Sequence, residues 1–187
     1  MNRTTVPYAL LLAALLGLSQ CKKKADPAPA DQLPPATQTG ANTFGCLLNG
    51  QPWTPNGNNG TPNLVVTYDP NYANGSLQIK AYRYSKEMTM SQAITIGGAP
   101  VRAVGSYPLR VYLTNTTPAY SVYFFDWNKT APCNRYDFAP DLRASGNLVV
   151  SRLDLNAGII SGTFEFTLAQ PSCDSVKVTQ GRFDKKL

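Results

Sequence analysis

The sequence predicts an all-β protein, an antiparallel β-sandwich or alternatively a β-barrel, with about ten strands. Apolar and polar side chains alternate in the run 160–168, which is typical of a half-buried antiparallel strand. Turn-forming residues separate such runs, and no useful helical period follows residue 42. The apolar side of that run holds Ile160, Phe164, Phe166 and Leu168, and the polar side holds Ser161, Thr163, Glu165 and Thr167.

The first expected element is a hairpin over residues 43–53. Asn49-Gly50 readily supplies the two positive φ angles of a type I′ turn. Phe44, Cys46 and Leu48 would share its inner face.

Further strands are expected at short intervals. Their ranges are 64–68, 76–84, 88–96 and 105–114, with a turn at 69–75. In the second of these strands Leu77, Ile79 and Ala81 alternate with polar residues and are expected to face the core.

Residues 119–127 differ because both sides of the predicted strand are apolar. The two sets are Tyr120, Val122 and Phe124 on one side and Tyr123, Phe125 and Trp127 on the other. Such a strand is either buried on both faces or carries an exposed aromatic strip. A long loop is expected at 128–145, and a meander over 146–183 completes the domain. Gly181 there is expected at a bulge, with Arg182 outward and Phe183 inward.

The N-terminus reads as an export signal over residues 1–20. Arg3 precedes an apolar run at 6–18, and Leu18-Ser19-Gln20-Cys21 looks like a bacterial lipobox, which predicts lipidation of Cys21. Gln20 stands where a smaller residue is usual, so an ordinary secretory signal cleaved nearby is the alternative.

Residues 21–41 are predicted to be the lipidated cysteine followed by a disordered Pro/Ala tether, because they contain four prolines and no aromatic residue. Lys22, Lys23 and Lys24 would add attraction to anionic headgroups, or simply begin a solvated spacer. Residues 42–187 then form one domain.

Three cysteines remain once Cys21 is lipidated. The loops that hold Cys133 and Cys173 would meet at one end of the meander, which favours a disulfide between them. Cys46 would stay free as a small core residue.

The composition excludes several kinds of site. The chain has no histidine, which removes Ser-His-Asp and Cys-His catalysis and His-based zinc sites. No phosphate loop or metal-ligand set is present, so no cofactor and no metal are expected. The net charge of +6 is dispersed rather than clustered, and no nucleic-acid partner is expected.

Carboxylates offer a minor route to catalysis, because a glycosidase needs only two acids. The available acids are Asp126, Asp137, Asp141, Asp154 and Glu165. Asp154, Asn156 and Gly158 imitate the start of a calcium loop, but the distal glutamate is missing and a hairpin turn explains them.

Aromatic residues offer a binding site instead. Trp53, Tyr120, Tyr123 and Trp127 could form a platform on which sugar rings stack, or could be core and edge packing.

Several stretches together resemble an uncharacterised family of Bacteroidota-type lipoproteins. They are the lipobox, the proline-containing segment and the runs 43–53, 160–166 and 178–184. The resemblance implies a cell-envelope β protein and carries no known activity. Asp174-Ser175-Val176 is similar to the acceptor pattern for O-linked glycans in such bacteria. Related lipoproteins bound for the cell surface have an acidic run where this chain has Lys22–Lys24, so an outer-membrane anchor facing the periplasm is expected.

The sequence thus predicts a lipid-anchored, non-enzymatic module that binds an envelope protein or glycan. The alternatives are a dedicated glycan-binding module and a carboxylate-based glycoside hydrolase. Exposure of Tyr120, Tyr123 and Trp127 would favour the glycan-binding module.

Overall fold

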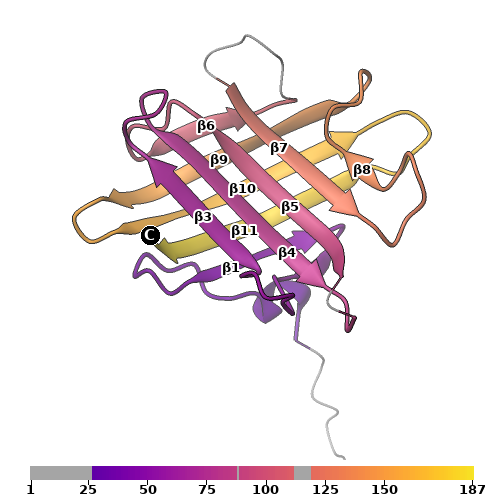
Figure 1. The fold of residues 1–187 in the computed structure, drawn as a ribbon, viewed down its shortest axis with the longest axis horizontal. Helices are drawn as coiled ribbons and strands as arrows, with labels where there is room; N and C mark the ends of the chain where they lie inside the picture. Colours follow the sequence, from indigo (N-terminus) through magenta and orange to yellow (C-terminus); the bar gives the residue numbers. More distant parts are fainter. Residues whose placement is uncertain (1–26, 88, 112–118) are drawn as a thin grey trace, which may run out of the picture.

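The computed structural model describes residues 27–87, 89–111 and 119–187 and shows two antiparallel sheets packed face to face (Figure 1). The predicted β-sandwich is confirmed. The barrel alternative is wrong, because the strands form two separate sheets rather than one closed one. The predicted signal peptide and Cys21 lie outside the described residues.

One sheet has six strands in the order β2-β1-β11-β10-β9-β6. Their bounds are Thr43–Leu48 for β1, Gln51–Trp53 for β2, Gly105–Leu109 for β6, Arg143–Asp154 for β9, Ile159–Ala169 for β10 and Val176–Lys186 for β11. The meander predicted from the alternation at 146–183 forms the centre of this sheet. Residues 112–114 of the strand predicted at 105–114 lie outside the described residues.

The other sheet has five strands in the order β3-β4-β5-β7-β8. Their bounds are Leu64–Asp69 for β3, Ser76–Tyr84 for β4, Met90–Ala99 for β5, Ala119–Asp126 for β7 and Arg135–Tyr136 for β8. In Figure 1 these strands lie in front and cross the direction of β9, β10 and β11. Strand β8 corrects the sequence prediction of an unbroken loop over 128–145. It has only two residues, which is too short for a recognisable alternation.

Two local predictions about backbone geometry can be compared with the structure. Asn49 and Gly50 have φ angles of 49° and 82°, which confirms the tight turn of the first hairpin. The register of β10 with β11 shifts between the Phe164–Gly181 and Phe166–Val178 pairs, so a bulge lies next to Gly181, as predicted. Gln180, rather than Gly181, has the positive φ of 52°. Gly181 is needed for a different reason, since a Cβ there would lie only 2.4 Å from the ring of Phe164.

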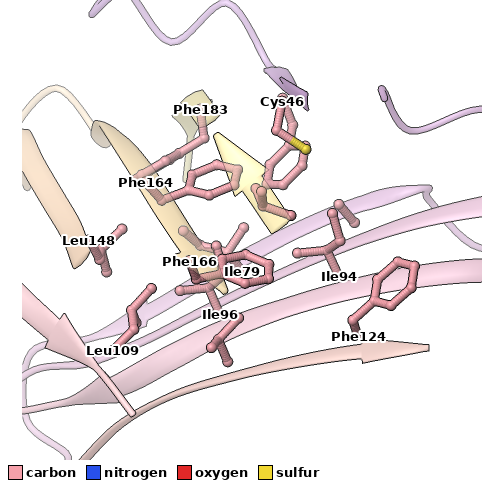
Figure 2. Close-up of a cluster of buried hydrophobic side chains, with 14 of the residues drawn as sticks. Cys46, Ile79, Ile94, Ile96, Leu109, Phe124, Leu148, Phe164, Phe166 and Phe183 are labelled. Atoms are coloured by element: carbon pink, nitrogen blue, oxygen red, sulfur yellow. The ribbon is translucent and has the colours of Figure 1, made fainter. Parts of the chain in front are cut away.

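The core fills the space between the inner faces of the two sheets. Phe164, Phe166 and Leu148 of the six-stranded sheet point toward Ile79 and Ile96 of the five-stranded sheet (Figure 2). All of these side chains are buried, as the alternation in the sequence predicted.

The predicted cysteine arrangement is confirmed. Cys133 and Cys173 form a disulfide with a Cα–Cα distance of 5.4 Å. The bond joins the segment before β8 to the connection between β10 and β11, so it links the two sheets at one end. Cys46 is free and fully buried (Figure 2). Burial, only partly opposed by the charge of Arg83, raises the pKa of its thiol to about 12.

The prediction of a disordered tether as far as residue 41 is wrong for the described part of that segment. Residues Pro29–Gln32 form a 3-10 turn, η1, and Leu33 is buried. We call residues 33–41 the strap, because they run over the outer face of β1, β10 and β11. Pro34 packs against Gly45, and its carbonyl accepts a hydrogen bond of 3.4 Å from Arg182 Nη1. Residues 21–26 of the predicted tether lie outside the described residues.

Asp184 on β11 holds the strap in place. Its Oδ1 accepts hydrogen bonds from the backbone N–H of Gly40 at 2.8 Å and from Ser161 Oγ at 2.6 Å. Its Oδ2 accepts hydrogen bonds from Thr37 Oγ1 at 2.6 Å and from the N–H groups of Thr39 and Ala41 at 2.9 and 3.0 Å. The sequence did not predict the strap, because hydrogen bonds from its backbone N–H groups hold it in place and it has no periodic pattern of apolar residues.

This cluster has two consequences for the carboxylate and its neighbour. Burial opposes ionisation of Asp184, but the hydrogen bonds from Ser161, Thr37, Ala41 and Gly40 outweigh it and hold its pKa below its ordinary value. Ser161, predicted to face outward, does so but is fully buried beneath the strap.

Candidate functional site

The outer face of the five-stranded sheet carries a group of aromatic side chains. Val122 and Phe124 of β7 point into the core, so Tyr123 and Phe125 point outward, and Trp127 follows just after the strand. We define the aromatic face as Tyr82, Tyr123, Phe125, Trp127 and Phe138. The exposed strip that the sequence offered as one of two interpretations of 119–127 is therefore present.

The rings of the aromatic face pack against one another in pairs. The ring centroids of Phe125 and Trp127 lie 5.3 Å apart and the planes differ by 14°. Those of Tyr123 and Phe138 lie 5.3 Å apart at 41°. Trp127 is 46% exposed and Phe138 65% exposed, so both pairs present a ring to solvent. A flat, partly exposed ring pair can stack on a planar or ring-shaped ligand.

Strand register shows how outward residues of this face line up across the sheet. Tyr82, Ala93, Phe125 and Arg135 are directly opposite one another on β4, β5, β7 and β8 and form one row across the sheet. Ala93 is the small residue in the row and is buried between its larger neighbours. The row therefore lacks a central protrusion and ends at a guanidinium group.

Arg135 is fixed at the edge of the aromatic face by two contacts. Its guanidinium carbon lies 5.7 Å from the centroid of the Phe125 ring. Its Nη2 donates a hydrogen bond to Asp137 Oδ2 at 2.5 Å. The Arg135 side chain is 59% exposed, whereas that of Asp137 is 9% exposed. The buried carboxylate thus orients an exposed cation beside the rings.

A buried polar network supports the backbone around Trp127. Trp53 Nε1 donates to Gln92 Oε1 at 2.8 Å, and Gln92 Nε2 donates to Asp126 Oδ2 at 3.1 Å. The other oxygen of Asp126 accepts a hydrogen bond of 3.1 Å from the Asn128 N–H. The N–H of Trp127 itself donates to the Ser91 carbonyl at 2.9 Å. The position of Trp127 is therefore determined from inside the sandwich.

The four aromatic residues predicted from the sequence do not form one platform. Tyr123 and Trp127 lie on the aromatic face. Trp53 is 1% exposed and packs in the core, edge-on to Phe44 and under the guanidinium of Arg83. Tyr120 lies on the inward side near the other end of β7, where its hydroxyl donates to the Pro100 carbonyl at 2.7 Å.

Sequence reasoning missed Tyr82, Phe138 and Arg135 as members of the site. Phe125 was visible in the alternation of 119–127 but was not selected. Phe138 and Arg135 came from a segment interpreted as a loop, where no periodic signal marks a direction. Only the pairing of β8 with β7 brings them to this face.

The candidate catalytic acids are dispersed over different elements. Asp126 and Asp137 are buried and hydrogen-bonded as described. Asp154 pairs with Arg152 at 2.8 Å, and the positive φ of Gly158 confirms the hairpin turn expected there. Glu165 is exposed on the outer face of β10 and Asp141 in the segment before β9.

Three further observations concern ligands and anchoring. No group of three or more acidic or cysteine side chains that could hold a metal ion occurs in the described ranges. Among the same residues, no helix has the length and apolar character needed to cross a membrane. Ser175 is exposed just before β11, and its glycosylation stays a prediction.

Comparisons of the chain with protein-family models, with curated proteins and with solved structures found no match. The resemblance to envelope lipoproteins therefore stays a prediction.

Proposed function

We propose that this protein is a non-catalytic, lipid-anchored module of the cell envelope that binds a glycan on its aromatic face. The observation that carries the proposal is the exposed Trp127 ring stacked on Phe125 on the outer side of the five-stranded sheet. Sugar rings have apolar faces that stack on aromatic side chains while their hydroxyl groups stay hydrated or hydrogen-bonded at a polar rim.

The position of the aromatic face on the outside of the sheet favours a role in ligand binding over a role in stability. Side chains that point away from the core contribute little to stability, and an exposed cluster of aromatic residues favours aggregation unless it has a partner. The network from Trp53 through Asp126 places Trp127 without needing any ligand, so the site is preorganised.

The anchor rests on the lipobox before Cys21, and an outer-membrane position facing the periplasm rests on the Lys22–Lys24 run. A binding role for an envelope protein is supported less, because an exposed tryptophan ring directly suits the apolar face of a sugar. A glycoside hydrolase is supported least, since Asp126 and Asp137 already have hydrogen-bond partners inside the fold.

Titration of the mature protein with a panel of soluble polysaccharides, followed by tryptophan fluorescence and calorimetry, tests the proposal. Trp127→Ala should weaken binding about tenfold or more, because stacked anchors carry most of such binding energy. Tyr72→Ala is the matched control, since Tyr72 is 68% exposed in the β3–β4 turn outside the aromatic face. Equal affinity of both variants, or no binding to any glycan, contradicts glycan binding. The mass of the mature N-terminus is measured on the same sample, and an unmodified Cys21 contradicts the anchor.

A further inference from the structure

We propose that the aromatic face selects an acidic glycan, and that Arg135 is the residue that pairs with its carboxylate or sulfate group. This inference rests on the proposed function, because it assumes that a sugar ring stacks on Phe125 and Trp127. It adds the chemical class of the ligand and a specificity-determining residue, neither of which follows from stacking alone.

The first argument is the orientation of Arg135. Phe125 and Arg135 are directly opposite on β7 and β8, so their side chains share the outer face. The guanidinium lies against the Phe125 ring, and Trp127 stacks on the same ring. A ligand that stacks on the exposed Trp127 ring therefore lies on the same outer face as the cation, with Phe125 in contact with both residues.

The second argument is the number of hydrogen-bond donors that Arg135 has left. A guanidinium carries five N–H donors in a planar fork that matches a carboxylate or sulfate. Among the described residues, Arg135 donates a side-chain hydrogen bond only from Nη2 to Asp137. Its Nε and Nη1 therefore keep their donors, and 59% of the side chain is exposed to receive an anion.

The third argument is the role of Asp137. Asp137 is nearly buried and holds one end of the guanidinium, which lowers the entropy lost when the other end binds. Arg135 is thus preorganised to bind a second anion in addition to the carboxylate of Asp137.

The charges around the aromatic face favour the same ligand. Lys80 lies on the outer face of β4 one row from Tyr82, and Lys129 follows Trp127 in the exposed turn after β7. The carboxylate of Asp137 is already paired with Arg135. Lys80 and Lys129 add positive charge near the rings, which attracts acidic chains and makes their binding sensitive to salt.

The test compares acidic and neutral forms of the same sugar chains on the mature protein. Oligogalacturonides are compared with their methyl esters for the carboxylate, and dextran sulfate with dextran for the sulfate. Wild type should bind one acidic form about tenfold or more tightly than its neutral form, because an Arg–anion pair adds charge-assisted hydrogen bonds. The preferred pair identifies the anion.

Arg135→Gln should abolish this preference, and Arg135→Lys, which keeps the charge but lacks the fork, should retain only part of it. Arg102→Gln is the matched control, because Arg102 is exposed in the segment between β5 and β6, away from Trp127. It should leave the preference unchanged. Thermal melting of each variant establishes that it is folded. If Arg135→Gln does not fold, the reduced preference of Arg135→Lys alone tests the inference.

The outcomes separate the inference from the proposed function. Neutral glycans that bind through Trp127 without any acidic preference overturn the inference and leave glycan binding intact. A preference that persists in Arg135→Gln, or that Arg102→Gln removes equally, also overturns it. Absence of any glycan binding overturns both proposals.

Discussion

The two outer faces of the sandwich are built from the same kind of strand but end in opposite surfaces. The six-stranded sheet exposes polar side chains such as Thr163, Glu165 and Lys177, and the strap covers part of its outer face. The five-stranded sheet exposes the aromatic face, where Trp127 is 46% and Phe138 65% exposed. This contrast is why we attribute the aromatic face to the ligand proposed above.

Residues on the two outer faces also differ in what they contribute, with stability on one face and proposed ligand binding on the other. Asp184 and the strap contribute to stability, because Asp184 accepts hydrogen bonds from backbone N–H groups of the strap. They lie on a face that has no role in the proposed site. In our proposal Arg135 and Trp127 serve recognition, because they remain open to solvent while interior hydrogen bonds support the backbone around them. Substitutions on the two faces should therefore change different measurable quantities.

The largest expected change in the free energy of unfolding comes from a substitution in β7, whose two sides face the core and the aromatic face. Phe124→Ala should lower the free energy of unfolding by about 3–5 kcal/mol, because it leaves a cavity in the core. Phe125→Ala, on the next residue, should lower it by about 1 kcal/mol, because that ring lies outside the core and is only partly buried. Urea denaturation of both variants measures the difference. Similar losses from the two would show that the aromatic face is structural.

The next effect concerns the covered face. Asp184→Asn should lower the free energy of unfolding by about 2–3 kcal/mol at pH 7, since an amide cannot accept all the hydrogen bonds of the charged carboxylate. The pKa of Asp184 is lowered in the folded protein, so its contribution is complete above the unfolded pKa of about 3.9. It is lost as the pH falls below that value toward the folded pKa.

Urea denaturation between pH 7 and pH 3 measures this dependence. The gap in stability between wild type and Asp184→Asn should narrow below about pH 4. Asp141→Asn, at an exposed aspartate, serves as the control and should show no comparable gap. A gap that stays constant down to pH 3 would mean that the charge of Asp184 does not hold the strap.

The smallest effect concerns the interior that separates the two faces. Cys46 should resist alkylation by iodoacetamide at pH 8 in the folded protein, because burial raises the pKa of its thiol to about 12 and blocks access. Unfolding in urea without a reductant should expose it. Peptide mapping reads the label at Cys46 directly, and rapid labelling of the native protein would indicate that the sheets separate readily.

The strands of the core were predictable because their signals are local. Alternation over 160–168 and turn residues such as Asn49-Gly50 act within a few residues, and the structure confirms them. The Cys133–Cys173 disulfide was predictable too, because a meander places its alternate loops at one end. The strap was not, because its backbone donors reach a carboxylate more than 140 residues away in the sequence.

The candidate site was only half predictable for the same reason. The sequence showed that 119–127 has two apolar sides, but it could not say which aromatic residues would meet on the surface. It therefore grouped Trp53, a core residue, with Trp127, an exposed one. Arg135 and Phe138 joined the site only through a two-residue strand that pairs with β7.

By itself the sequence determined that the described chain is built from antiparallel strands and which side of most strands is apolar, because side-chain alternation and turn preference are properties of neighbouring residues. Only the tertiary structure decided which outer face is covered, which remains open, and that a guanidinium lies beside the open rings. These depend on strand order and register, which bring together residues that carry no local mark of one another.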